Sequence, residues 1–185
     1  MVAQLRRRFG VHCATLSQTK LLSPTVARVT EGLVEERDRW VLPLGGRTVA
    51  RCFVDYSFGL VLDGKGRVEV SLSYFRFRDS DGVEHSLNTE ADRRLLAPAL
   101  ACFGLSVAQA CALKSGQLRI TYTDGTLIEA DPHDQFESWQ VSGPGNLLVV
   151  SAPGGGEPAV WDGSRGSVVS LDELRFPPSR DDQLG

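Results

Sequence analysis

A chain of 185 residues, 42% of them hydrophobic, is long enough to bury the core of one domain of ordinary size. The formal net charge of -3 and the isoelectric point near 5.6 provide no excess positive field, so nucleic acid is not expected as a partner. No apolar run approaches the roughly 20 residues that span a bilayer, and no secretory pattern is seen. We therefore expect a cytoplasmic protein that has no membrane partner.

The amino-terminal region differs in pattern from the rest of the chain. Residues 1–37 carry scattered apolar positions and are predicted to be an extension, either flexible or weakly helical over residues 25–37. From Trp40 onward, short alternating apolar segments are separated by Gly, Pro and Asp, which is typical of strands. Residues 38–162 are the predicted β-rich domain, and residues 163–185, rich in Gly, Ser and charge, are a predicted flexible tail.

Asp63-Gly64 and Asp124-Gly125 each stand between two alternating apolar runs. This arrangement predicts a hairpin, because a tight turn between strands requires positive φ and these residue types tolerate it. Related segments precede the two hairpins, Val49-Ala50-Arg51-Cys52 and Val107-Ala108-Gln109-Ala110-Cys111. We expect two related antiparallel meanders that arose by internal duplication and that superpose about an approximate twofold axis.

A short helical segment is predicted between the two meanders. Asn88 and Thr89 are good N-caps, and the segment is expected to end near Gly104. Pro98 would remove a hydrogen bond from an α-helix, so two short pieces are expected, with Pro98 in the first turn of the second piece. The apolar face of the second piece is predicted to consist of Ala99, Leu100, Cys102 and Phe103.

These elements together predict the fold class. The chain is expected to be a single α+β domain, mainly antiparallel β, in which two related meanders flank a short helical segment. The strands are expected to form either one sheet or a partly open barrel around that segment.

The four cysteines occur singly, without the paired spacing of zinc sites. Because a core of this size does not require disulfides, we expect free and mostly buried thiols. No metal and no other cofactor is predicted. The cysteines are Cys13, Cys52, Cys102 and Cys111.

The densest group of titratable residues is Asp131, His133 and Asp134, in a break between predicted strands. Carboxylates beside a histidine can bind a metal or transfer protons, but a solvated loop has the same composition and no second motif supplies metal spacing. Trp139 and Trp161, in short strands, either fill the core, which burial statistics favour, or present binding anchors. These five residues are the candidate binding site.

Motifs for catalysis are not found. Gly154-Gly155-Gly156 lacks the Lys-Ser/Thr of a phosphate loop and does not lead into a helix, so it is interpreted as a turn. No Gly-x-Ser-x-Gly element occurs, and no serine or cysteine has a recognisable base. No catalytic residue is therefore predicted.

Several short elements occur in the order found in a family of small uncharacterised actinobacterial domains, which the chain resembles over about residues 45–162. The resemblance implies a compact, mainly β fold in a bacterial cytoplasm; it implies no activity and no site residue. It rests on Val54-Asp55-Tyr56 through Leu62, the Asp81-Gly82 hairpin, Leu95-Leu96-Ala97-Pro98, the Leu118 to Gly125 hairpin, Trp139, Ser151-x-Pro153-Gly154-Gly155 and Trp161.

A strand-rich pattern without a convergent set of catalytic residues favours a non-enzymatic protein-interaction or binding module. Immunity proteins, which neutralise toxins by covering a surface, are an analogue of similar size, charge and strand content. The expected partner is a protein, which includes a second copy bound through an edge strand. The alternative is a small-ligand-binding protein or an enzyme that uses residues 131–161, with Trp139 at a pocket mouth.

Overall fold

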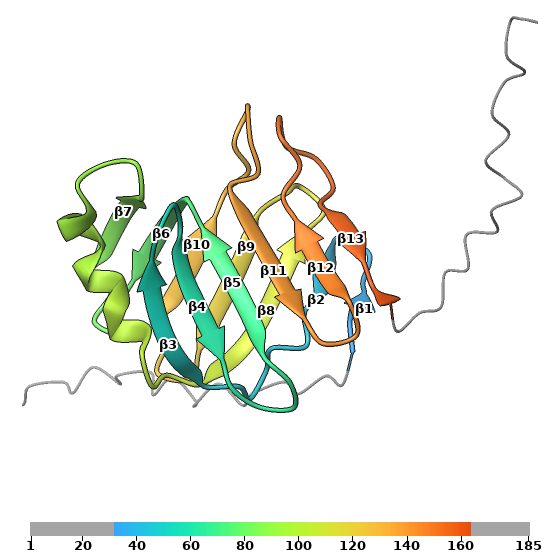
Figure 1. Ribbon diagram of the computed structural model, residues 1–185, viewed down its shortest axis with the longest axis horizontal. Coiled ribbons are helices and arrows are strands. Elements are labelled where there is room, and N and C mark those ends of the chain that lie inside the picture. Colours follow the sequence, from blue (N-terminus) through green and yellow to red (C-terminus); the bar gives the residue numbers. More distant parts are fainter. Residues whose placement is uncertain (1–31, 164–185) are drawn as a thin grey trace, which may run out of the picture.

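The computed structural model describes residues 32–163, whose strands form two antiparallel sheets stacked one over the other (Figure 1). The extension and the tail that were predicted to be flexible lie almost entirely outside residues 32–163, so their flexibility stays a prediction. Within residues 32–163 no helix has the length and apolar character needed to cross a bilayer.

The first sheet has seven strands in the order β1-β2-β8-β9-β10-β6-β7, and every neighbouring pair is antiparallel. Its bounds are β1 (Val34–Glu35), β2 (Arg39–Val41), β8 (Val107–Leu113), β9 (Leu118–Tyr122), β10 (Leu127–Ala130), β6 (Tyr74–Arg78) and β7 (Glu84–Asn88).

The second sheet has six strands in the order β13-β12-β11-β5-β4-β3, again antiparallel throughout. Its bounds are β13 (Ala159–Trp161), β12 (Leu147–Val150), β11 (Trp139–Gly143), β5 (Val68–Leu72), β4 (Phe58–Leu62) and β3 (Val49–Val54).

The core lies between the two sheets and follows from the alternation of side chains along each strand. In β5, Val68, Val70 and Leu72 are buried while Glu69 and Ser71 face outward. The mainly antiparallel fold with one short helical segment is confirmed. The strands divide into two sheets rather than one, because each sheet has an apolar face that must be covered by the other.

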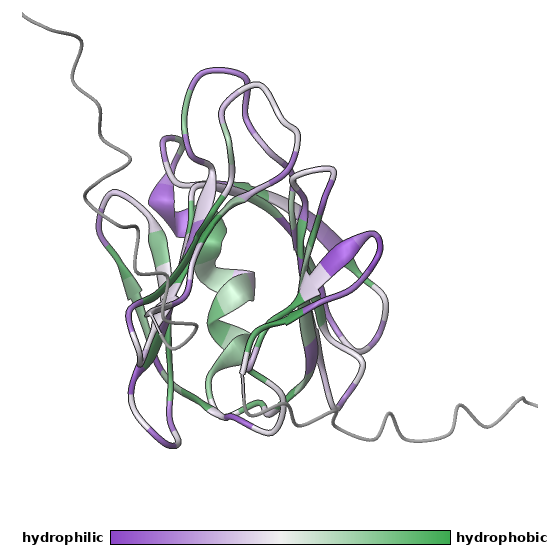
Figure 2. Cartoon of the chain, turned by 90° about the vertical axis from the view of Figure 1, so that its right-hand side faces the viewer, coloured by the Kyte–Doolittle hydropathy of each residue, from purple (hydrophilic) through white to green (hydrophobic). Residues whose placement is uncertain are grey.

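The helical segment is a 3-10 helix, η1 (Arg93–Cys102), which lies between the two layers at one side and is mostly apolar (Figure 2). Its N-cap is Asp92, whose carboxylate accepts the Arg94 N–H. The predicted caps were wrong because Asn88 belongs to β7. The predicted division into two pieces was also wrong, since η1 continues through Pro98.

The three-residue turn of η1 decides which side chains enter the core. Leu96, Ala99 and Cys102 are spaced by three and are all buried. Leu100 and Phe103, predicted to share the apolar face, are instead exposed. An α-helical period would have placed Phe103, four residues after Ala99, on the same side as Ala99, whereas the three-residue period turns it outward.

Residues 32–37 form an edge of the first sheet rather than the end of a helix. Val34–Glu35 pair with β2, and Leu33 is buried. The helix predicted over residues 25–37 is therefore wrong where the structure describes it, and its remainder lies outside the described residues. Backbone pairing with β2 satisfies this segment's hydrogen bonds.

Asp63-Gly64 and Asp124-Gly125 each connect the second and third strands of a meander, β3-β4-β5 in one case and β8-β9-β10 in the other. The second turn is tight, since the Tyr122 N–H donates to Thr126 O. The first belongs to a longer loop between Leu62 and Val68. The first strand of each meander has a register shift, between Val49 and Arg51 and between Val107 and Gln109.

The segments that enter β3 and β8 bind each other reciprocally. Thr48 and Ser106 form an antiparallel bridge, and their hydroxyls are 3.0 Å apart. Each backbone hydrogen bond from the first segment to the second is matched by an equivalent bond from the second to the first, as in two segments related by a local twofold axis. The bonds run from Val49 N to Leu105 O, Val107 N to Arg47 O, Gly104 N to Val49 O and Gly46 N to Val107 O.

Candidate functional site

The predicted loop between β10 and β11 is ordered by ring contacts around His133. The His133 ring stacks on Phe136 with a centroid distance of 3.9 Å and on Tyr74 at 5.3 Å. Its Nδ1 accepts the Gln135 N–H at 3.2 Å, and its carbonyl accepts the Gly154 N–H at 2.9 Å. These contacts hold the loop against the outer face of β6.

The neighbouring carboxylates interact with other side chains of the first sheet. Asp131 accepts a hydrogen bond from Gln117 Nε2 at 2.6 Å, and its Oδ2 is 3.4 Å from the Arg76 guanidinium. Arg76 also lies 3.3 Å from Glu129. Asp134 is exposed. In the described part of the chain, no cluster of His, Cys, Asp and Glu is arranged to hold a metal ion.

The two tryptophans occupy opposite environments. Trp139 is 1% exposed and its indole N–H donates to Gly116 O at 2.9 Å, so it belongs to the core and not to a pocket mouth. Trp161, on edge strand β13, is 55% exposed. None of the five predicted site residues lines the pocket described below, and the burial of Trp139 separates it from the exposed Trp161.

The described cysteines are free thiols, as expected, and burial makes them poor nucleophiles. Burial raises the pKa of Cys102 to about 12, and it also raises the pKa of Cys52 and of Cys111. Cys13 lies outside the described residues. A thiolate at neutral pH is therefore not expected from these three residues.

We expect the free energy of unfolding to fall as the pH rises above about 9. The unfolded chain loses the Cys102 proton near its ordinary pKa of 9.0, whereas the folded chain keeps it up to about pH 12. Burial likewise raises the pKa of Tyr122. The slope per buried group approaches about 1.4 kcal/mol per pH unit between the two pKa values.

Urea denaturation at pH 8, 9, 10 and 11 measures this slope. The Cys102→Ala variant should give a shallower decline, because its unfolded state no longer releases that proton. An identical slope in the variant and the original protein would contradict the assignment to Cys102.

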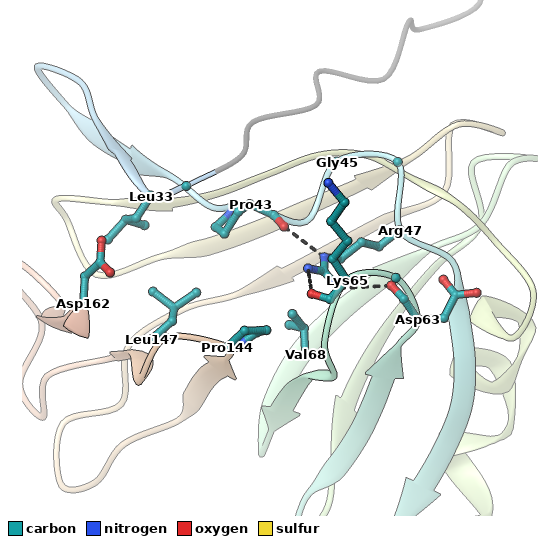
Figure 3. A pocket seen from close by; sticks show the side chains of 14 residues that line it. Leu33, Pro43, Gly45, Arg47, Asp63, Lys65, Val68, Pro144, Leu147 and Asp162 are labelled. Carbon is teal, nitrogen blue, oxygen red and sulfur yellow. Dashed lines mark hydrogen bonds between the residues drawn. The ribbon is translucent and has the colours of Figure 1, made fainter. Parts of the chain in front are cut away.

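The main pocket of the described region lies where three turns meet, and it has a volume of about 610 Å³ (Figure 3). The turns are residues 43–47, between β2 and β3; residues 63–66, between β4 and β5; and residues 144–147, which lead into β12. Side chains that line it include Leu33, Pro43, Arg47, Lys65, Leu147 and Asp162.

Arg47 joins two of these turns by donating only to backbone carbonyls. Its Nε bonds Pro43 O at 3.1 Å. Its terminal nitrogens bond Gly66 O at 2.8 Å, and Asp63 O and Lys65 O at 3.1 Å. The third turn touches the second, since a Cβ at Gly66 would overlap the Pro144 side chain. The pocket walls are thus held by defined contacts.

The sequence analysis missed this pocket although it recognised each turn. Residues 43–46, 63–66 and 143–146 all carry the Gly and Pro typical of turns. Their meeting depends on which strands pair, and a turn signal contains no such information. Its described lining combines apolar side chains with four charged ones, Arg47, Asp63, Lys65 and Asp162.

A second surface feature is the outer side of η1, which is apolar and exposed. Leu95, Leu100 and Phe103 are 60%, 49% and 65% exposed. No charged residue occurs from Leu95 to Phe103. Edge strand β3 lies beside the helix, and Val54 at its end and Tyr56 just after it are also exposed. We call this surface the η1 face.

Comparison with known proteins agrees with the expected resemblance to a family of unknown function. No curated protein and no solved structure matches the chain. A family model, described as a family of unknown function (DUF6188), matches residues 40–162. This range contains η1, both meanders and all five predicted site residues. The chain belongs to the DUF6188 family of unknown function.

Proposed function

We propose that the protein is a non-enzymatic protein-interaction module, that the η1 face is its contact surface, and that the partner is a second copy of the chain. The observation that carries the proposal is the uncharged segment Leu95–Phe103, of which only one side enters the core. A helix that is apolar all round is normally buried on all sides. A protein partner would cover the remaining sides.

The size of the exposed side chains supports a partner. Leu95, Leu100 and Phe103 project from one short helix and its C-cap, and Tyr56, in the chain segment that follows β3, is 95% exposed. Contiguous apolar surface with a polar rim is typical of protein interfaces. Aromatic residues and arginine are enriched at the centres of such interfaces.

The charges around the η1 face favour a second copy. Arg51 and Arg93 have no carboxylate within 4.0 Å among residues 32–163. Asp55 and Glu90 bind Ser57 and Tyr74 but no cation of the described chain. Because both signs are left without an ion pair, a twofold contact can pair cations of one copy with acids of the other.

Edge strand β3 provides a second reason. It is the last strand of its sheet, and beyond Val49, which binds Gly104 and Leu105, its outer backbone groups have no partner strand among residues 32–163. Such an edge is a template for pairing with another chain. Antiparallel pairing of two β3 strands about a twofold axis would place the two η1 faces at the same junction.

The immunity-protein analogy is consistent with this mode of action, since those proteins also act by covering a surface. An internal duplication is the proposed origin of the two meanders, supported by their related sequences, register shifts and reciprocal bonds. A cytoplasmic location in an actinobacterium remains part of the proposal. Asp131, His133, Asp134 and Trp161 stay predicted binding residues.

We expect the protein to be dimeric at micromolar concentration, and Phe103→Asp or Leu100→Asp to make it monomeric. A carboxylate at the centre of an apolar contact would be buried without a partner, which weakens association. Sedimentation equilibrium with the full chain over a hundredfold concentration range measures the change in association constant.

Trp161→Asp is the matched control, since Trp161 has a similar exposed fraction but lies on β13, at the opposite edge of the same sheet. It should leave the dimer unchanged. A wild-type monomer at every concentration would overturn the second-copy proposal. Dissociation by Trp161→Asp alone would assign the contact to a different edge.

A further inference from the structure

We propose that the pocket between the three turns binds a small molecule that carries one carboxylate on an apolar body. This site is separate from the η1 face, and it does not depend on the proposed dimer. The proposal rests on the charge at one end of the pocket, the apolar floor and the fixed positions of the walls.

The charged end of the pocket contains two cations, Arg47 and Lys65. Neither has a carboxylate oxygen within 4.0 Å in the described chain. Arg47 is surrounded by carbonyl dipoles, which bind its N–H groups but leave the positive charge in place. An anion bound at this end would pair with both cations.

Acidic groups in the lining limit the charge of the ligand. The Asp63 carboxylate accepts the Thr48 N–H at 2.9 Å, so its position is set by the backbone of β3's entry segment. Asp162 lies at the other end of the pocket, beside Leu33 (Figure 3). Since only Asp63 lies at the same end as Arg47 and Lys65, that end keeps one net positive charge, and a monoanion fits it better than a phosphate dianion.

The floor between these ends is apolar. Leu33, Val68 and Leu147 line it, and Pro43 and Pro144 flank it (Figure 3). A cavity of about 610 Å³ has the size of ordinary small-molecule sites, which combine apolar walls with a few placed polar groups. The apolar part of the ligand would occupy this floor while its carboxylate meets Arg47 and Lys65.

The pocket is preformed, which reduces the entropic cost of binding. Arg47 ties residues 43–47 to residues 63–66 through backbone carbonyls. Gly66 has a φ of +78° and packs against Pro144, so a larger residue would be strained and would push this turn away. Binding therefore requires little rearrangement of the walls.

Calorimetric titration of the full chain with three probes that each carry an eight-carbon chain tests the proposal. Octanoate should bind saturably at one site, and octanol and octyltrimethylammonium should bind at least tenfold more weakly. Lys65→Gln should weaken octanoate binding about tenfold, because a charge-assisted contact is lost. Lys114→Gln removes the same charge at a site paired with Glu35 and should leave the affinity unchanged.

Three results would overturn the proposal. They are an absence of octanoate binding at millimolar concentration, equal binding of octanoate and octanol, and unchanged octanoate affinity in both Lys65→Gln and Lys65→Glu. Circular dichroism establishes that each variant is folded. Sedimentation in the presence of octanoate tests the dimer separately. Failure of octanoate binding would leave the proposed dimer standing, and a monomeric protein would leave the proposed pocket standing.

Discussion

Replacing Trp139 by alanine is expected to lower the free energy of unfolding by about 3–5 kcal/mol. The indole is 1% exposed between the sheets, and its N–H donates to Gly116 O at 2.9 Å. The substitution leaves a large cavity and an unpaired buried carbonyl, and both effects act in the same direction. Equilibrium denaturation in urea, followed by circular dichroism, measures the change.

Trp161→Ala serves as the control for this experiment. The side chain is 55% exposed on an edge strand, so its removal should cost about 1 kcal/mol or less. Comparable losses in the two variants would show that Trp139 does not occupy the centre of the core.

Replacing Arg47 by alanine is expected to cost about 2–3 kcal/mol, since hydrogen bonds from a charged donor are lost together. The guanidinium is the link among the carbonyls of Pro43, Asp63, Lys65 and Gly66. Hydrogen exchange of residues 63–66 should accelerate more than exchange in the strands, because the loop loses its anchor.

Arg47→Lys should recover less than half of the loss. A lysine keeps the charge but cannot reach the same set of carbonyls with one ammonium group. Arg51→Ala, which removes an arginine stacked on Phe53, should change stability by about 0.5 kcal/mol. Equal effects of Arg47→Ala and Arg51→Ala would contradict the anchoring role.

Strands were predictable because each depends on a local period. Val68, Val70 and Leu72 alternate with polar neighbours, so their inward direction follows from the sequence. The turns at Asp63-Gly64 and Asp124-Gly125 were predictable for the same reason, since positive φ at Gly64 and Gly125 is a local requirement.

The helix shows where local reasoning failed. Its position between the two meanders and its end near Gly104 were predicted, but its N-cap, its continuity through Pro98 and its outward face were not. A 3-10 rather than an α-helical period is selected by the fit of Leu96, Ala99 and Cys102 to the core. That fit depends on strands far away in sequence.

The candidate site residues also show what local sequence patterns can and cannot predict. His133 and Asp131 were recognised as a polar cluster, and the structure gives them neighbours such as Tyr74 and Gln117. Trp139 was assigned to both core and pocket mouth, because residue type alone does not distinguish them. Burial decided in favour of the core.

The sequence by itself determined that this protein is a mainly antiparallel β domain with a short helix, since alternation and turn chemistry act over a few residues. Only the tertiary structure decided that the strands form two sheets, that Leu100 and Phe103 face outward, and that Arg47 and Lys65 meet Leu147 at one pocket. The physical reason is that these features depend on strand pairing between distant segments, whose energy is not encoded in any local pattern.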